Sequence, residues 1–226
     1  LAWCTWDGHQ SMKRCPVFWE RTAKLVIPEV LSKYPFLCRF IDVTTAEDLY
    51  ECYDERHPLT RAKKRELGVR LFDYIRSQGL VVGGEHGRWW AVPVIDYVEG
   101  MMSGGTDNYA WDAPYLRPPM NKDGNKWEQY ETLGMNPQYR VPLWELVFHD
   151  CVVSTWYWGD ANDFLTLADP KFTDMKNCYN ILYGTIPLLW ANEETGGAGP
   201  SKPGSWVANR ELFLETYRNV CKLHEV

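Results

Sequence analysis

The segment from 36 to 90 constrains the fold most, because it predicts one strand–helix–strand unit. The apolar run 36–41 has the length of a strand. Residues 60–78 carry apolar side chains at helical spacing, and the glycine directly after them is a typical stop signal for a helix. A second buried strand is predicted over 80–84. This order favours two parallel strands joined by a helix.

A carboxylate follows each of these two strands. Asp42 comes directly after the first strand, and Glu85 comes directly after the second. Because parallel strands joined by a helix end at the same edge of their sheet, we expect both side chains to face one cleft. The rest of the chain is then expected to form the walls of that cleft.

Length and charge narrow the class of protein. With 226 residues the chain can bury one sizeable core, and α/β barrels often occupy such a length as one domain. The net charge of −6 argues against a nucleic-acid partner. The basic run 61–65 is expected on the exposed face of the predicted helix. No apolar stretch approaches the roughly 20 residues of a membrane span. The sequence does not decide whether the protein is cytoplasmic or exported from a bacterium.

The seven cysteines are scattered, and none forms a C-x-x-C pair. Their odd number favours free, buried thiols over a disulfide framework, and their spacing gives little support to a zinc site. No cofactor is predicted, although a structural divalent cation such as calcium is left open. A serine nucleophile is disfavoured because the chain has no G-x-S-x-G elbow. Cysteine nucleophiles are disfavoured because apolar surroundings make thiols inert.

Aromatic residues are unusually frequent, with 12 Trp and 13 Tyr. Many lie beside Gly, Pro or Asp, in segments that are typical of loops. Exposed aromatic rings in loops favour flat amphipathic ligands such as sugars, and the alternative is that they only pack long loops. Trp89, Trp90 and Trp158 are the aromatic residues that we expect to contact a sugar.

The remaining chain predicts further elements of the same kind. A helix is expected over 17–33, and a long aromatic, Gly- and Pro-rich insertion over about 101–140 is expected to act as a lid or to bind substrate. Two more strands are predicted over 141–150 and 177–190. Asn209 is expected to cap a final helix.

Together these elements predict an α/β fold, a (β/α)₈ TIM-type barrel read from its C-terminal face. Only about five or six strands can be counted, whereas a closed barrel needs eight. We therefore expect residues 1–226 to form the C-terminal part of a larger catalytic barrel.

Two carboxylates at neighbouring strand ends are what glycoside hydrolysis requires. The two groups need different environments so that their pKa values separate. The hydroxyls of Thr44 and Thr45 are expected to keep Asp42 ionised, and a partly apolar wall after Glu85 is expected to favour its protonated form. Strand-end acids also occur as purely structural groups, so this pattern alone leaves both interpretations open.

Four motifs, in this order along the chain, resemble glycoside hydrolase family 129, which is related to the family 101 endo-α-N-acetylgalactosaminidases. They are FIDVT at 40–44, RHPLTR at 56–61, GGEH at 83–86 and VPLWELVFHD at 141–150. The resemblance implies a retaining α-N-acetylgalactosaminidase with a (β/α)₈ catalytic domain that acts on glycans of the mucin type. It further implies that Asp42 is the nucleophile and Glu85 the general acid/base. Members of that group are larger, with a β-rich domain before the barrel.

Three polar residues outside the pair are candidates for sugar binding. His149 and Asp150 end the strand predicted over 141–150, and Asp160 follows an aromatic segment. A metal-dependent phosphohydrolase site at His149 and Asp150 is disfavoured, because the chain has only five His. A purely structural role for these two residues is the remaining alternative.

Two functions from different classes follow. The first is a retaining α-glycosidase for α-linked N-acetylgalactosamine or a related galacto-sugar, with carboxyl groups about 5–5.5 Å apart. The second is a non-catalytic carbohydrate-binding or scaffold module. It predicts that Asp42 or Glu85 pairs with a basic side chain or points away from the cleft.

Overall fold

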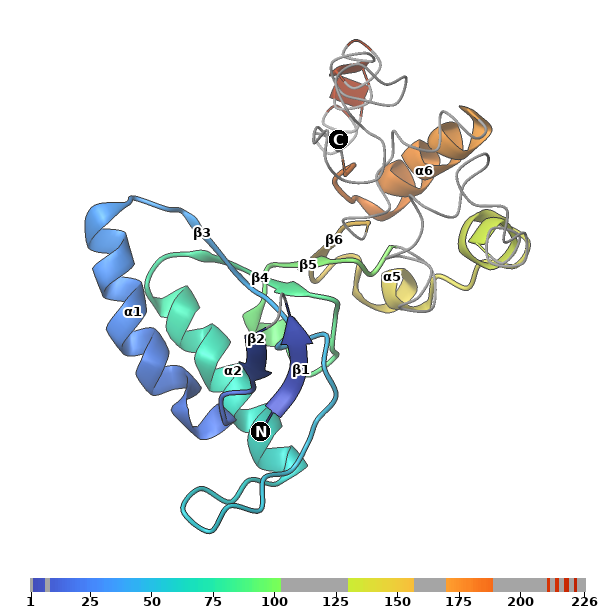
Figure 1. Cartoon of the computed structure of the whole chain (residues 1–226). Helices are drawn as coiled ribbons and strands as arrows, with labels where there is room; N and C mark the ends of the chain where they lie inside the picture. The colour runs from blue at the N-terminus through green and yellow to red at the C-terminus, as the bar shows by residue number, and fades with distance from the viewer. Residues whose placement is uncertain are drawn as a thin grey trace. The chain divides into compact units, whose positions relative to one another are not determined.

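The computed structural model describes residues 2–6, 9–102, 130–156 and 170–188, and isolated positions between 211 and 222. The chain divides into two compact units, Leu1–Asp96 and Tyr97–Val226 (Figure 1). Most of the insertion predicted over 101–140 and the predicted cap at Asn209 lie outside the described residues.

The first unit begins with a hairpin and continues with alternating helices and strands. Its elements are β1 (Ala2–Trp6), β2 (His9–Met12), the 3₁₀ turn η1 (Pro16–Phe18), α1 (Trp19–Lys33), β3 (Cys38–Ile41), α2 (Arg61–Ser77), β4 (Val81–Glu85) and the 3₁₀ turn η2 (Val92–Val94). Strands β1 and β2 pair antiparallel. Helix α1 confirms the helix predicted over 17–33 and packs beside α2 (Figure 1).

The predicted strand–helix–strand unit is confirmed. Strands β3 and β4 are parallel, with Cys38 opposite Val81 and Ile41 opposite Gly84. Asp42 directly follows β3, and Glu85 is the last residue of β4. The two carboxylates therefore leave the sheet at the same edge.

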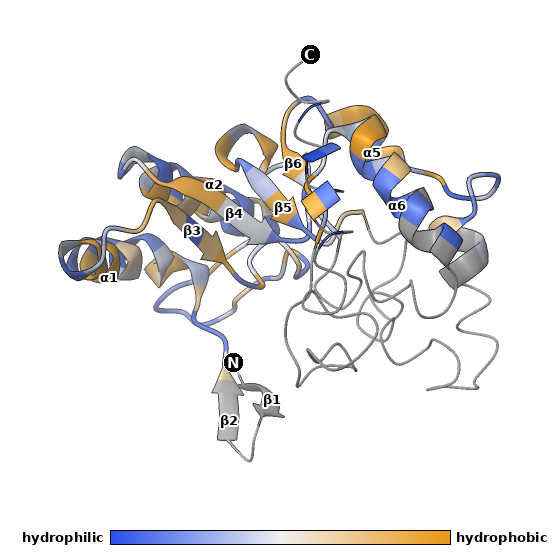
Figure 2. Ribbon diagram, turned by 90° about the horizontal axis from the view of Figure 1, so that it is seen from above, coloured by the Kyte–Doolittle hydropathy of each residue, from blue (hydrophilic) through white to orange (hydrophobic). Residues whose placement is uncertain are grey.

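Local signals explain the bounds of α2. The side chain of Thr60 accepts a hydrogen bond from the Lys63 amide and caps the start of the helix. Gly79 directly follows the last turn with φ +77°, a conformation that favours glycine. The buried face of the helix includes Leu67, Leu71, Phe72 and Ile75, as the spacing predicted. Figure 2 shows that hydrophobic and hydrophilic residues alternate along α1 and α2.

The basic run 61–65 is not wholly exposed, and the prediction is wrong at Lys64. This side chain is 2% exposed, because it lies on the helix face that carries Leu67 and Leu71. Its ammonium group donates to Glu47 Oε1 and to the Asp48 carbonyl, both at 2.6 Å. It also lies 3.7 Å from the centre of the Tyr50 ring. Lys64 thus joins α2 to the connection that follows β3.

The second unit contains short strands and helices. Its described elements are β5 (Tyr97–Glu99), the π-helical turn η3 (Tyr130–Met135), α5 (Leu143–Phe148), β6 (Val153–Ser154) and α6 (Pro170–Tyr183). Strands β5 and β6 are parallel, with Tyr97 opposite Val153.

The strand predicted over 141–150 is wrong, because this segment forms helix α5. The helix buries Glu145 and brings the rings of Trp144 and Phe148 to 4.6 Å between centroids. The indole of Trp144 donates to Ser154 Oγ at 2.9 Å, which fixes α5 against β6. Figure 2 shows α5 largely in the hydrophobic colour. A short run of apolar residues can form either a strand or a helix, because its hydrophobic pattern does not distinguish the two.

The strand predicted over 177–190 is also wrong, because most of its first half belongs to helix α6. Gly184, with φ +62°, follows the last residue of that helix. The buried positions Lys176, Tyr179 and Asn180 have helical spacing, but two of them are polar. The hydrophobic pattern therefore does not reveal the period of the helix.

A polar core holds the second unit together. The Arg140 guanidinium donates to the carbonyls of Gly134 and Met102 at 2.7 and 2.6 Å, and lies 3.4 Å from Glu145 Oε1. The Trp156 indole is fully buried and donates to Asn180 Oδ1 at 2.8 Å.

Among the described residues, no helix is both long and apolar enough to cross a membrane.

Candidate active site

The candidate site is the edge of the β3–β4 pair where Asp42 and Glu85 lie. The chain turns sharply after each carboxylate, since Val43 has φ +62° and His86 has φ +50°. Positive φ is rare for residues other than glycine, and for a β-branched residue such as valine it marks a strained position. Both turns thus fix the direction in which the strand-end carboxylates point.

The two carboxyl groups are in hydrogen-bonding contact with each other. The Val43 amide donates to Glu85 Oε2 at 2.9 Å, so the turn after β3 also binds the carboxylate of β4. Burial, followed by the hydrogen bond to Glu85 and the charge of Glu85, raises the pKa of Asp42. Ionisation of Asp42 is therefore less favourable beside Glu85.

The role expected for Thr44 and Thr45 is wrong. The Thr45 hydroxyl donates to the backbone carbonyl of Glu85 at 2.6 Å. The amide of Thr44 donates to the backbone carbonyl of Asp42 at 2.7 Å. These contacts position the backbone on both sides of the pair. The pKa of Asp42 is raised, whereas the expected role of the two threonines would have lowered it.

Arg88 is a positioning residue that the sequence did not reveal. Its guanidinium donates to the carbonyls of Thr45 and Ala46 at 3.0 and 2.7 Å. It also lies 3.1 Å from Asp48 Oδ1. Arg88 thereby ties the chain after β4 to the connection after β3, and only the fold brings these segments together.

The two adjacent tryptophans have different surroundings. Trp89 is 64% exposed, and the Arg65 guanidinium lies 5.4 Å from the centre of its ring. Trp90 is buried, with its ring 6.5 Å from that of Phe72 and in close contact with Gly68. Trp89 can still offer a ring to a sugar, whereas the position of Trp90 is that of a core residue.

The other predicted binding residues fall in the second unit. His149 follows the last residue of α5, and its Nδ1 lies 2.7 Å from the Glu145 carbonyl. Asp150 is exposed and accepts a hydrogen bond from the Cys151 thiol at 3.2 Å. Trp158 and Asp160 lie outside the described residues.

The cysteines differ from expectation. Cys38, Cys151 and Cys178 are free and exposed, so the prediction of buried thiols is wrong for them. Cys15 and Cys52, which are only partly exposed, form one group with His57 whose side chains could hold a metal ion. Spacing along the chain gave no sign of this group, since its members come from two separate segments.

The structure thus places two carboxyl groups at the ends of adjacent parallel strands. The chain belongs to the family of glycosyl hydrolases related to family 101, glycoside hydrolase family 129, whose family model matches residues 9–201. This confirms the family predicted from the four motifs. No curated protein matches the chain.

Solved structures of a bifidobacterial enzyme share the fold. The chain is similar to alpha-N-acetylgalactosaminidase NagBb from Bifidobacterium bifidum in complex with GalNAc, with a TM-score of 0.63 and 21% identity. The match covers 97% of this chain and 29% of that one. The ligand-free form gives a TM-score of 0.62 at the same identity and coverage. The predicted fold class, part of an α/β barrel, is thereby confirmed.

Proposed function

We propose that this chain carries the catalytic pair of a retaining glycoside hydrolase. Its substrate is α-linked N-acetylgalactosamine or a related galacto-sugar, on glycans of the mucin type. Asp42 is the nucleophile and Glu85 the general acid/base. The chain spans 29% of the solved chain that it resembles, so the proposal concerns the natural protein in which this chain occurs.

The observation that carries the proposal is the contact between the two carboxyl groups. Retaining enzymes hold their carboxyl groups about 5–5.5 Å apart, whereas inverting enzymes need about 6.5–9.5 Å to admit a water molecule between base and sugar. The 2.9 Å hydrogen bond from the Val43 amide to Glu85 Oε2 keeps the two carboxyl groups close together. This closeness supports the shorter, retaining separation over the wider, inverting one.

The reaction then proceeds by two displacements. Asp42 attacks the anomeric carbon, while Glu85 gives its proton to the glycosidic oxygen and the aglycone leaves. In the second step Glu85 takes a proton from water, the water oxygen attacks the anomeric carbon, and the bond to Asp42 breaks. Glu85 regains its proton and Asp42 its charge.

The choice of sugar rests on the relatives. The chain belongs to family 129, and the solved protein of similar fold is named an alpha-N-acetylgalactosaminidase and was crystallised with GalNAc. Exposed Trp89, together with His149 and Asp150, are the described residues that we propose for sugar contacts. Trp158 and Asp160 remain proposals of the same kind.

The alternative, a non-catalytic carbohydrate-binding module, finds less support. It predicts that Asp42 or Glu85 pairs with a basic side chain or points away from the cleft. For Asp42, the neighbours that shift its pKa are Glu85 and the Val43 amide, as the catalytic interpretation predicts.

The stereochemistry of the product tests the mechanism. We expect proton NMR of a fresh reaction on an aryl α-N-acetylgalactosaminide to show the α-anomer of the free sugar first, with the β-anomer appearing later by mutarotation. A β-anomer as the first product would establish inversion and contradict the roles given to Asp42 and Glu85. Binding of the sugar without turnover would favour the binding module.

A further inference from the structure

A group of soft metal ligands lies in the first unit, outside the carboxylate pair. The Cys15 and Cys52 sulfurs and a ring nitrogen of His57 all lie within 4.8 Å of one another. The Cys52 sulfur is 3.4 Å from Nδ1 of His57. In a tetrahedral zinc site, sulfur and nitrogen ligands lie about 3.5 Å apart, as follows from the usual metal–ligand bond lengths. The Cys52–His57 pair already has this spacing.

We propose that Cys15, Cys52 and His57 bind one zinc-class divalent ion, with a water molecule as the fourth ligand. Two thiolates and an imidazole are the ligands that zinc prefers, and their two negative charges balance those of the ion. This site lies outside the Asp42–Glu85 pair, and the proposal does not rest on the proposed glycosidase chemistry.

The backbone holds the three ligands in place before any ion binds. Cys52 and Leu59 exchange two backbone hydrogen bonds of 2.9 Å, which fold the intervening loop back on itself. The His57 amide donates to the Asp54 carbonyl at 3.0 Å within that loop. Cys15 comes from the segment before α1, where its carbonyl accepts from the Phe18 amide at 3.0 Å. The ion would therefore join two segments that are far apart along the chain.

Asp54 gives His57 the orientation that a metal ligand needs. Oδ2 of Asp54 lies 3.5 Å from Nε2 of His57. Arg56 donates to both oxygens of Asp54, at 2.9 and 2.7 Å, and fixes that carboxyl group in place. A proton on Nε2 of His57 would face this carboxyl group, and the Nδ1 lone pair would then be directed at Cys52. Histidines that bind metals commonly donate their second nitrogen to a carboxylate in this way.

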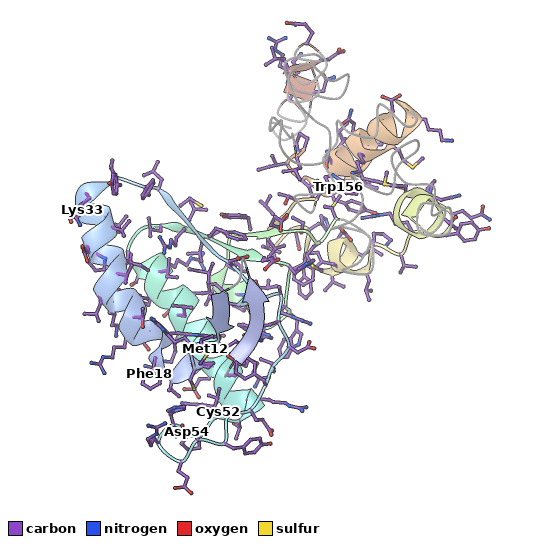
Figure 3. The ribbon with its side chains drawn as sticks, viewed as in Figure 1. Met12, Phe18, Lys33, Cys52, Asp54 and Trp156 are labelled. Carbon is purple, nitrogen blue, oxygen red and sulfur yellow. The ribbon has the colours of Figure 1, made fainter. Side chains whose placement is uncertain are left out.

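The surroundings admit an ion and a water molecule. The ligands line a cavity of about 470 Å³, to which Met12, Phe18 and Tyr50 also contribute. The ring of Phe18 meets the His57 ring edge-on at 5.4 Å between centroids. Figure 3 shows Met12, Phe18, Cys52 and Asp54 gathered near the start of α1, with Lys33 at its opposite end.

Metal binding replaces thiol protons. Cysteine binds a metal ion as the thiolate, so a proton on the sulfur must leave. When the ion binds, two S–H bonds break, two metal–sulfur bonds form and roughly two protons pass to the solvent.

Calorimetry with Zn²⁺ and absorption spectroscopy with Co²⁺ test the site on the reduced natural protein. We expect one equivalent of Zn²⁺ to bind saturably, with a binding enthalpy that changes with the buffer because protons are released. With Co²⁺ we expect a sulfur-to-cobalt charge-transfer band. Both signals should be lost in Cys15→Ser and Cys52→Ser. The control Cys178→Ser, at an exposed cysteine of α6, should bind as the wild type does.

Two further measurements remain informative if a cysteine variant folds poorly. Asp54→Asn keeps all three ligands, and we expect it to weaken Zn²⁺ about 10–100-fold, as loss of such a carboxylate partner commonly does. On the wild-type protein, Zn²⁺ should protect Cys15 and Cys52 from alkylation while exposed Cys38, Cys151 and Cys178 still react.

Three results would overturn the proposal. The first is equal Zn²⁺ binding by the wild type and Cys52→Ser, and the second is no saturable binding by the reduced protein. The third is alkylation of Cys15 and Cys52 that Zn²⁺ does not slow. Because none of these readouts uses glycoside hydrolysis, failure of the metal site and failure of the proposed function are distinguishable.

Discussion

At the scale of single residues, the surroundings of Asp42 disfavour its charged form. Burial is the main cause that raises the pKa of Asp42, and the hydrogen bond to Glu85 and the charge of Glu85 add to it. Two carboxylates at the same edge of a sheet repel each other, so ionisation of Asp42 is less favourable beside Glu85.

The raised pKa of Asp42 predicts how the pair affects stability. A group whose pKa is higher in the folded state stabilises the fold below its unfolded pKa, and this contribution is lost as pH rises through the folded pKa. We therefore expect Asp42→Asn to unfold at a higher urea concentration than the wild type at pH 7. Below about pH 3, where aspartate is protonated in both states, this difference should disappear.

Asp73→Asn is the matched control, because Asp73 is exposed on α2. It should leave the urea midpoint nearly unchanged at both pH values. A wild type that is more stable than Asp42→Asn at pH 7 would mean that the charge of Asp42 is stabilised by its surroundings, contrary to the contacts described above.

At the scale of elements, Lys64 fixes α2 to the connection after β3. Its ammonium group is buried, and its partner Glu47 is only 11% exposed. Removal of one member of a buried ion pair commonly costs about 3–5 kcal/mol, because the other charge loses its partner. Glu47 keeps its ion pair with Lys13, so we expect Lys64→Met to cost about 2–3 kcal/mol in urea unfolding.

Lys63→Met provides the comparison on the neighbouring residue of the same helix. Lys63 is exposed and pairs only with Glu66 on the surface, an interaction worth about 0–1 kcal/mol. If both variants lost the same stability, the buried contacts of Lys64 would not be the anchor that we describe.

Gly68 of α2 lies directly against the ring of Trp90. A Cβ atom at 68 would lie 2.8 Å from Cη2 of Trp90. Alanine in a helix is usually favoured over glycine by about 1 kcal/mol, but we expect Gly68→Ala to destabilise by about 1–3 kcal/mol through overpacking. This prediction treats Trp90 as a core residue.

A double-mutant cycle of Gly68→Ala with Trp90→Leu checks this contact. The smaller leucine should relieve the clash, so Gly68→Ala should be near neutral or stabilising in that background. If the losses of stability from the two substitutions simply add, the indole of Trp90 does not contact Gly68. Trp90 would then be a candidate for sugar binding at the surface again.

Some helices and strands could be predicted from the sequence, and others could not. The β3–α2–β4 unit was predictable because its signals are local: two apolar runs of strand length, the helical spacing of the apolar residues in α2, and the glycine at 79. Helices α5 and α6 were mistaken for strands. The six residues of α5 are nearly all apolar, and α6 buries Lys176 and Asn180 among its core positions.

The candidate site was predictable in position but not in environment. The ends of the two predicted strands gave the positions of Asp42 and Glu85. The hydrogen bond of Thr45 to the Glu85 carbonyl and the contacts of Arg88 depend on residues about 40 positions apart. The Cys15–Cys52–His57 group depends on the same kind of long-range contact, so spacing along the chain did not reveal it.

At the scale of the whole molecule, the chain consists of two compact units and spans 29% of the solved chain it resembles. Both proposed catalytic residues belong to the unit Leu1–Asp96. The geometry of the pair is thus set within one unit.

Azide rescue of the natural protein tests the roles of Asp42 and Glu85 most directly. On an aryl α-N-acetylgalactosaminide, Asp42→Gly should lose about 10⁴-fold or more in rate, and azide should restore turnover with the β-glycosyl azide as product. Glu85→Ala should instead give the α-glycosyl azide, because Asp42 still forms the covalent intermediate. The control Asp73→Ala should keep the wild-type rate. Unchanged turnover in the Asp42 or Glu85 variants, or the same azide anomer from both, would contradict the assignment.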